Sequence, residues 1–287
     1  MKNIVIFGAS GQLGSCFKQV AENEGITNIH FPPESEADIL NPEALKQVFE
    51  KYKPAYAINC AAYTAVDKAE DDVELATKIN RTGAENIAKL CAEYGSVMVH
   101  VSTDFIFEGN APTPRKEDDI AEPINVYGQT KLDGEKDIIA VLEKYFILRT
   151  SWLYSEYGNN FVKTMLKLGA EREELKIIAD QIGTPTYGID LAYAIIEIIN
   201  TENTCYGIYH YSNEGVASWY DFAHAIFELS DTHVKVLPIP TSDYKTRAVR
   251  PAYSVMNKDK IKTTLGIEIP HWRDSLHICI NRLLNQV

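Results

Sequence analysis

The chain has 287 residues, enough for one large domain or two smaller ones with a substantial core. Its 45% apolar and 24% charged residues are typical of globular proteins, and its net charge of −12 disfavours nucleic acids and anionic membranes as partners. A small anionic ligand is still compatible with this charge, because local donors and helix N-termini bind anions.

The 5 cysteines stand at wide spacings, with no CxxC motif and no Cys/His cluster. This pattern argues against a disulfide framework and against a zinc site, and it favours a reducing compartment. The apolar run before Gly8 is too short for a signal peptide, and no apolar stretch is long enough to span a bilayer. We therefore expect a cytoplasmic protein that binds no metal.

Short apolar runs alternate with helical periods through the first half of the chain. Continuous apolar strands that alternate with helices indicate a parallel sheet covered on both faces. The pattern predicts strands at 4–7, 28–31, 55–59, 97–101 and 145–149, and helices at 11–24, 42–51, 73–94 and 127–144.

The alternation breaks down after Arg149, where polar, aromatic-rich stretches such as 151–160 and 207–219 are mixed with isolated helices. We expect an α/β fold with a Rossmann-like, doubly wound parallel sheet in a dinucleotide-binding domain, residues 1–150. A smaller C-terminal α/β substrate-binding domain would take residues 151–287. The amphipathic helix at 188–200 is expected to pack back on the first domain.

A glycine-rich turn, Gly8-Ala-Ser-Gly11-Gln-Leu-Gly14, lies between the first strand and the first helix. Glycines here permit a tight turn and let a pyrophosphate approach the N–H groups of a helix N-terminus. The GxxGxxG spacing departs from GxGxxG and also suits a turn with no ligand. Its position between strand and helix favours dinucleotide binding.

The choice between the two dinucleotides is open at this stage. NAD selection usually needs an acid at the end of strand two, and NADP selection an Arg nearby. Strand two ends in His30-Phe-Pro-Pro33 with neither, and Glu34 and Glu36 follow the prolines. Asp38 and Ile39 could contact the adenosine, or could merely precede the helix that begins near Pro42. The cofactor is therefore NADPH or NADH, with NADPH slightly favoured.

Tyr127 and Lys131 are four residues apart in a predicted helix and share one face of it. An ammonium there would lower the pKa of the phenol and make Tyr127 a usable proton donor. Ser102-Thr103-Asp104 follows the strand that begins at residue 97, at the sheet edge where ligands gather. A hydroxyl there could bind a ketone while Tyr127 protonates it, although the segment could equally cap the strand.

With these three pieces in place, the chain resembles the extended short-chain dehydrogenase/reductase superfamily, and within it the dTDP-4-dehydrorhamnose reductase family. The resemblance covers nearly the whole chain. It rests on the strings GASGQLG at 8–14, NCAAYTAVDKAE at 59–70, STDFIFEG at 102–109, VYGQTKLDGE at 126–135, RTSWLY at 149–154, GNNFV at 158–162, DQIGTPT at 180–186, SWYDFA at 218–223, and Arg250-Pro251 with Ser254.

The resemblance implies an NAD(P)H-dependent reduction of the C4 ketone of dTDP-4-dehydrorhamnose to dTDP-L-rhamnose, a step of polysaccharide precursor synthesis. Tyr127 would be the general acid, Lys131 would bind the nicotinamide ribose, and Thr103 would orient the ketone. Asp104 and Trp152 would line the sugar site, while Asn160 and Arg250 would bind the substrate pyrophosphate. The cofactor site would comprise Gly8, Ser10, Gly11, Gln12, Leu13, Gly14, Asp38, Ile39, Ala62, Tyr63, Thr64, Val101, Tyr127 and Lys131.

The sequence departs from the family in three places. Phe105 replaces a usual tyrosine, and strand two lacks the basic residue often present. Some members dimerise through a magnesium site whose first ligand is a Glu, where this chain has Cys16, a poor ligand for a hard cation. We therefore expect no interface magnesium, and a monomer or weak homodimer.

Three other interpretations stay open. A reductase that gives the C4 epimer, a dTDP-6-deoxy-L-talose, fits the same residues, and so does a nucleotide-sugar epimerase or dehydratase of the superfamily. A non-catalytic NADP-binding regulatory subunit is less favoured, because Thr103, Tyr127 and Lys131 are all present.

Overall fold

Six parallel strands form the central sheet of the computed structural model, which describes residues 2–111 and 113–285. Their order is β10-β5-β4-β3-β1-β2, and every neighbouring pair is parallel. The order reverses between β1 and β3, so the fold is the doubly wound Rossmann-like sheet that the sequence predicts. The strands are β1 (Ile4–Phe7), β2 (Ile29–His30), β3 (Tyr56–Asn59), β4 (Val97–Thr103), β5 (Tyr145–Thr150) and β10 (Gly207–His210).

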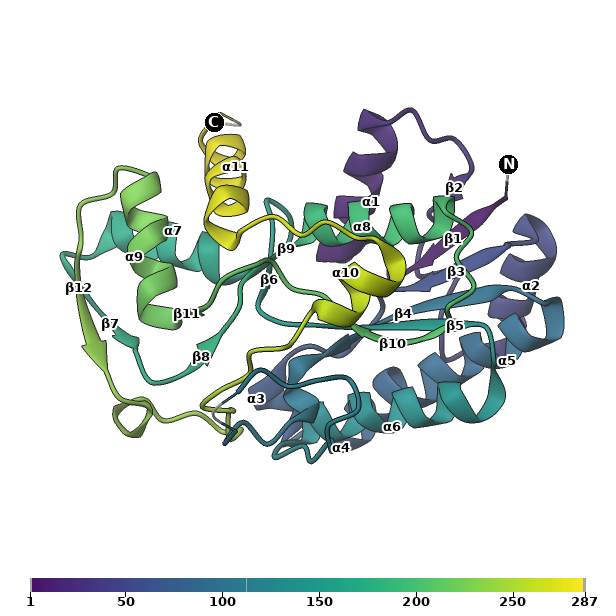
Figure 1. The fold of residues 1–287 in the computed structure, drawn as a ribbon, viewed down its shortest axis with the longest axis horizontal. Coiled ribbons are helices and arrows are strands. Elements are labelled where there is room, and N and C mark those ends of the chain that lie inside the picture. The colour runs from purple at the N-terminus through teal and green to yellow at the C-terminus, as the bar shows by residue number, and fades with distance from the viewer. Residues whose placement is uncertain (1, 112, 286–287) are drawn as a thin grey trace.

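Helices cover both faces of this sheet (Figure 1). Alternate residues of β1 enter different cores: Ile4 and Ile6 join the core under α1 and α8, whereas Val5 and Phe7 join the core under α2 and α5. This period of two is expected for a strand buried on both sides. The helices of these layers are α1 (Gln12–Asn23), α2 (Pro42–Tyr52), α5 (Ala84–Tyr94), α6 (Val126–Val141) and α8 (Gly188–Asn200).

The helix predicted at 73–94 is interrupted. It consists of α4 (Val73–Thr77), a π-helical segment at Lys78–Gly83 and α5. The segment turns the Asn80 side chain toward the site, where it accepts from the Tyr63 N–H at 2.8 Å and donates to the Thr130 hydroxyl at 3.0 Å. Such interruptions are frequent at functional sites.

The second half of the chain both extends the central sheet and builds a smaller lobe beside it (Figure 1). β10 pairs with β5, and α8 packs along α1. The division at residue 150 therefore stays a prediction about folding units. The remaining elements are α3 (Val66–Ala69), β6 (Leu153–Tyr154), α7 (Phe161–Glu171), β7 (Glu174–Ile178), β8 (Ile182–Gly183), β9 (Thr186–Tyr187), β11 (Ala217–Ser218), α9 (Trp219–Leu229), β12 (Lys235–Ile239), α10 (Asp259–Leu265) and α11 (Trp272–Asn285), with short 3₁₀ turns at Asp104–Ile106 and Thr241–Asp243.

None of the helices in the described ranges is long and apolar enough to cross a membrane.

Candidate active site

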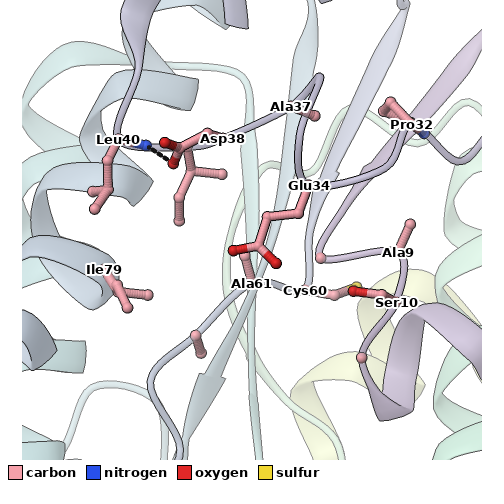
Figure 2. Close-up of a pocket in the computed structure, with 14 residues that line it drawn as sticks. Ala9, Ser10, Pro32, Glu34, Ala37, Asp38, Leu40, Cys60, Ala61 and Ile79 are labelled. Carbon is pink, nitrogen blue, oxygen red and sulfur yellow. Dashed lines mark hydrogen bonds between the residues drawn. The ribbon is translucent and has the colours of Figure 1, made fainter. Parts of the chain in front are cut away.

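A cavity of about 260 Å³ opens where the sheet order reverses, at the carboxyl ends of β1 and β3. Ligands of open α/β sheets bind at such a switch point. Figure 2 shows the cavity between the glycine turn on one side and Ile79 and Leu40 on the other. Its lining residues are Gly8, Ala9, Ser10, Gly11, Pro32, Glu34, Ala37, Asp38, Ile39, Leu40, Cys60, Ala61, Ala62 and Ile79.

The glycine turn has the geometry that a pyrophosphate requires. Gly8 has a φ of +76°, and a Cβ on it would lie 2.6 Å from the Ala61 nitrogen. A Cβ on Gly14 would lie 2.5 Å from the Gly8 carbonyl oxygen, so α1 packs closely on the turn. No side chain caps the N-terminus of α1 and its first turn carries no acidic residue, which leaves its N–H groups available to an anion. A dinucleotide therefore fits this site.

The part of the cavity lined by Glu34 and Asp38 is acidic. The Glu34 carboxylate projects into its centre (Figure 2), while the Asp38 carboxylate accepts the Leu40 N–H at 2.9 Å. No lysine or arginine is among the described residues that line the cavity. Glu36 instead points away, because it pairs with Lys51 at 3.4 Å.

Tyr127 lies in the first turn of α6, directly beside the end of β4. The Asn125 side chain caps the helix by accepting the Gly128 N–H at 2.8 Å, which fixes where the helix starts. A Cβ on Gly128 would lie 2.1 Å from the Phe105 carbonyl oxygen, so only glycine lets the two segments approach this closely. The Tyr127 and Phe105 rings meet edge to face, with centroids 5.7 Å apart.

Thr103 and Asp104 are almost fully buried beside Tyr127. The Thr103 hydroxyl donates to Asp104 at 3.1 Å, and the other Asp104 oxygen has no hydrogen-bond partner among the described residues. Burial raises the pKa of Asp104 to about 7.

Burial also raises the pKa of Tyr127 to about 12; a hydrogen bond with Thr103 opposes this rise and the nearby Asp104 charge adds to it. The sequence predicted a lower pKa through Lys131. The structure differs because the Lys131 amine is turned elsewhere, toward the Val101 carbonyl at 2.7 Å and the His100 ring at 3.2 Å. Tyr127 is thus held as a phenol, the protonated form that an acid needs.

A buried ion pair joins α6 to the sheet. Glu135 lies four residues after Lys131 and receives the Arg149 guanidinium at 2.8 Å. Glu135 also accepts the hydroxyl of Ser102, the residue before Thr103. The helix that carries Tyr127 and Lys131 is therefore tied to the strand ends that carry Thr103.

Two stacked tryptophans lie beside Phe105. The Trp152 and Trp219 rings are 3.6 Å apart and 9° from parallel, and Trp152 has an unusual backbone φ of +45°. Together with Arg250 they line a small hollow beside Phe105, and Arg250 also pairs with Asp67 at 2.6 Å. The structure thus brings Trp152 and Arg250 together.

Other predicted residues lie differently. Asn160 caps α7, and its Nδ2 donates to the Gln12 Oε1 at 2.9 Å. Its amide is therefore already used in structural hydrogen bonds. The Tyr63 hydroxyl donates to Asp72 at 2.8 Å, Leu13 belongs to the core, and Thr64 is exposed. Val101 offers its carbonyl to Lys131. The roles assigned to these residues stay predictions.

Sequence reasoning singled out neither Trp219 nor His100. Trp219 lies in the segment SWYDFA at 218–223, but nothing in the sequence shows that its ring stacks on Trp152. His100 is a polar residue within an otherwise apolar strand, and this is the feature of the sequence that could have marked it as a candidate site residue.

Comparison with known proteins extends these observations to the whole chain. The family described as "RmlD substrate binding domain" matches residues 1–285. A dTDP-4-dehydrorhamnose reductase of Aggregatibacter actinomycetemcomitans is 41% identical over 286 residues, which cover 96% of this chain and 97% of that protein. The chain belongs to the dTDP-4-dehydrorhamnose reductase family.

Two solved structures of the family share its fold. A dTDP-4-dehydrorhamnose reductase from Clostridium acetobutylicum is 42% identical, with a TM-score of 0.94 and full coverage of both chains. One from Bacillus anthracis, in complex with NADP, is 41% identical, with a TM-score of 0.93 and full coverage of both chains. A UDP-glucose 4-epimerase from Thermus thermophilus, 18% identical with a TM-score of 0.82, shares the fold alone.

Cys16, which the sequence resemblance aligned with a magnesium ligand of some relatives, is fully buried and would lie 2.7 Å from a Cβ on Gly188 of α8. No group of three metal-binding side chains occurs in residues 2–111 and 113–285. The expected lack of an interface magnesium and the oligomeric state stay predictions.

Proposed function

We propose that this chain reduces the C4 ketone of dTDP-4-dehydrorhamnose to dTDP-L-rhamnose, with NAD(P)H as the reductant, in the cytoplasm and as a monomer or weak homodimer. The observation that carries the proposal is that Tyr127 lies beside Thr103 at the end of β4, with Lys131 one turn further along α6, in a chain that matches the family over residues 1–285.

In this proposal each residue has a distinct task. When bound, the dihydronicotinamide supplies the hydride. Thr103 orients the ketone oxygen, and Tyr127 donates its proton to that oxygen as negative charge develops there. Lys131 holds the nicotinamide ribose, and the N–H groups at the start of α1 hold the pyrophosphate. Trp152 packs on the sugar, and Arg250 binds the substrate's phosphates.

A Tyr127→Phe variant tests the proposal. Loss of the general acid should lower kcat by about 10²-fold or more, measured as NADPH oxidation with the dTDP-keto-sugar. Tyr193→Phe is the matched control, because the Tyr193 hydroxyl contacts Glu24 on the surface. Unimpaired turnover of Tyr127→Phe would refute the role of Tyr127. NMR of the product distinguishes the rhamnose from the 6-deoxytalose, and turnover without net NAD(P)H consumption would point to an epimerase or dehydratase.

We also propose that NADH binds more tightly than NADPH, which reverses the slight preference expected from the sequence. The Glu34 carboxylate in the adenosine cavity can accept a ribose 2′-hydroxyl but repels a 2′-phosphate, and no cationic side chain among the described lining residues offsets it. The Bacillus anthracis relative was solved with NADP, so binding of both cofactors is compatible with the family.

Dissociation constants measured by quenching of protein fluorescence test this preference. NADH should bind at least about tenfold more tightly than NADPH, and Glu34→Arg should reverse the order. Glu36→Gln is the matched control, because Glu36 pairs with Lys51 outside the cavity. Equal affinities in the wild type, or no change in Glu34→Arg, would overturn the assignment.

A further inference from the structure

The hollow beside Phe105 is far too small for a nucleotide sugar. Its volume is about 10 Å³, roughly the space that one water molecule needs. A ligand that contacts both Trp152 and Arg250, as the proposed function requires, can therefore enter only if one wall of the hollow moves. The two walls differ in how firmly they are held.

The wall that contains the tryptophans is tightly packed. The Trp152 ring stacks on Trp219 at 3.6 Å, and a Cβ on Gly183 would lie 2.6 Å from the Trp152 ring. Trp219 in turn contacts Phe161, with ring centroids 4.7 Å apart. All three rings pack against the main core, so their displacement would cost many apolar contacts.

The other wall contains Arg250, the last residue of a segment that we call the strap, residues 244–250. Ala248 is the one buried residue of the strap, and the neighbouring Val249 is exposed. Polar contacts hold the strap in place instead, among them a hydrogen bond of 2.9 Å from Asn125 to the Val249 carbonyl oxygen. A segment with so few buried apolar contacts opens more readily than one packed in the core.

Two carboxylates provide most of these polar contacts. Asp67 accepts the Ala248 N–H at 3.0 Å with one oxygen and the Arg250 guanidinium at 2.6 Å with the other. Asp71 pairs with Arg247 at 2.7 Å. Burial raises the pKa of Asp67, but the Ala248 N–H and the Arg250 charge outweigh burial and hold the pKa below its ordinary value. Asp67 is therefore charged at neutral pH.

The Arg250 guanidinium is incompletely satisfied in this arrangement. Its Nη2 donates to Asp67, whereas its Nε is buried and has no hydrogen-bond partner among the described residues. An unpaired buried donor is costly, and the cost disappears once an acceptor reaches it. A diphosphate offers several charged oxygens, which guanidinium groups bind in pairs. It can therefore compete with Asp67 for Arg250.

We propose that the strap is a lid over the substrate hollow and that the Asp67–Arg250 pair is its latch, which the diphosphate of a nucleotide opens by replacing Asp67 on Arg250. The inference rests on the proposed function for the identity of the ligand, a nucleoside diphosphate sugar. Because Arg250 belongs both to the latch and to the binding site, access to the hollow is coupled to recognition of the diphosphate.

Binding of dTDP tests the latch without any turnover. Asp67→Asn keeps an oxygen for the Ala248 N–H but removes the charge that holds Arg250. The Kd for dTDP, measured by isothermal titration calorimetry, should therefore fall about threefold or more. Glu228→Gln is the matched control, because it removes the same charge from an exposed pair with Arg273 at 2.7 Å in the smaller lobe. An unchanged or raised Kd in Asp67→Asn would overturn the latch, and so would a lack of dTDP binding in both the wild type and this variant.

The loss of a negative charge by itself favours an anion, so a second comparison separates that effect from the latch. In an Arg250→Gln background the carboxylate has no guanidinium to hold. Asp67→Asn should then lose most of its effect on the Kd for dTDP. A fall of the same size in that background would show a general charge effect and would contradict the proposal.

Hydrogen exchange measures the opening of the strap directly. In the protein without nucleotide, amide exchange of the peptide that spans 244–250 should be about threefold or more faster in Asp67→Asn than in the wild type or in Glu228→Gln. Equal exchange would overturn the lid. If Asp67→Asn does not fold, Asp71→Asn takes its place, since it removes only the exposed outer pair. A chain that meets these expectations with dTDP but does not reduce the keto-sugar would refute the proposed function and leave the lid standing.

Discussion

Gly128 offers a direct way to displace Tyr127 without removing any functional group. In Gly128→Ala the added Cβ would lie 2.1 Å from the Phe105 carbonyl oxygen, whereas real Cβ atoms do not come closer than 3.0 Å. The start of α6 and the end of β4 must therefore separate by about 1 Å. Misplacement of a catalytic group by about 1 Å can cost about 10²-fold in rate.

We expect kcat of Gly128→Ala to fall by about 10²-fold in the NADPH oxidation assay, because Tyr127 moves away from Thr103. The fold should persist, since alanine favours a helix over glycine by about 1 kcal/mol and offsets part of the strain. Gln129→Ala is the control, as the next residue is exposed on the same helix. Wild-type kcat in a folded Gly128→Ala would refute the argument that close approach of these segments positions the acid.

Three further outcomes follow from the buried charges of the site. Lys131→Met should weaken cofactor binding and lower kcat together, and wild-type values for both would exclude a role for the amine. Glu135→Gln should lower the free energy of unfolding by about 3–5 kcal/mol in a urea titration, because it leaves the buried Arg149 charge unpaired; a change within error would mean that Arg149 finds another partner. Asp104→Asn should raise Tm at pH 8 but not near pH 4. The Asp104 pKa rises from 3.8 to about 7 on folding, so the cost of its buried charge is complete above pH 7 and disappears below 3.8. An equal shift of Tm at both pH values would contradict that reasoning.

The local parts of the fold could be predicted from the sequence. β1 and α8 have the predicted bounds, and the other strands of the first half differ by one or two residues at their ends, because continuous apolar runs and helical periods are local signals. The π-helical segment could not be predicted, since its Asn80 bonds to Tyr63 and Thr130, which only the folded chain brings together. β10 was missed for a similar reason: its four residues pair with residues 61 positions earlier in the chain.

The candidate site shows the same limit. The glycine turn and the pair Tyr127 and Lys131 could be found, because their chemistry depends on spacing within one element. The ionisation of Tyr127 could not be predicted, because it depends on burial and on where the Lys131 amine points. The amine points to the Val101 carbonyl and the His100 ring, which are brought to α6 only by the packing of the helix on the sheet.

The place of β10 at the border of the sheet has a consequence for anyone who wishes to study the halves of the molecule separately. A fragment that stops at residue 150 would leave residues 146–149 of β5 without their outer neighbour, and their unsatisfied N–H and C=O groups would pair with other chains. Such a piece would tend to aggregate. Shortened versions for crystallisation or screening should therefore retain the chain through His210.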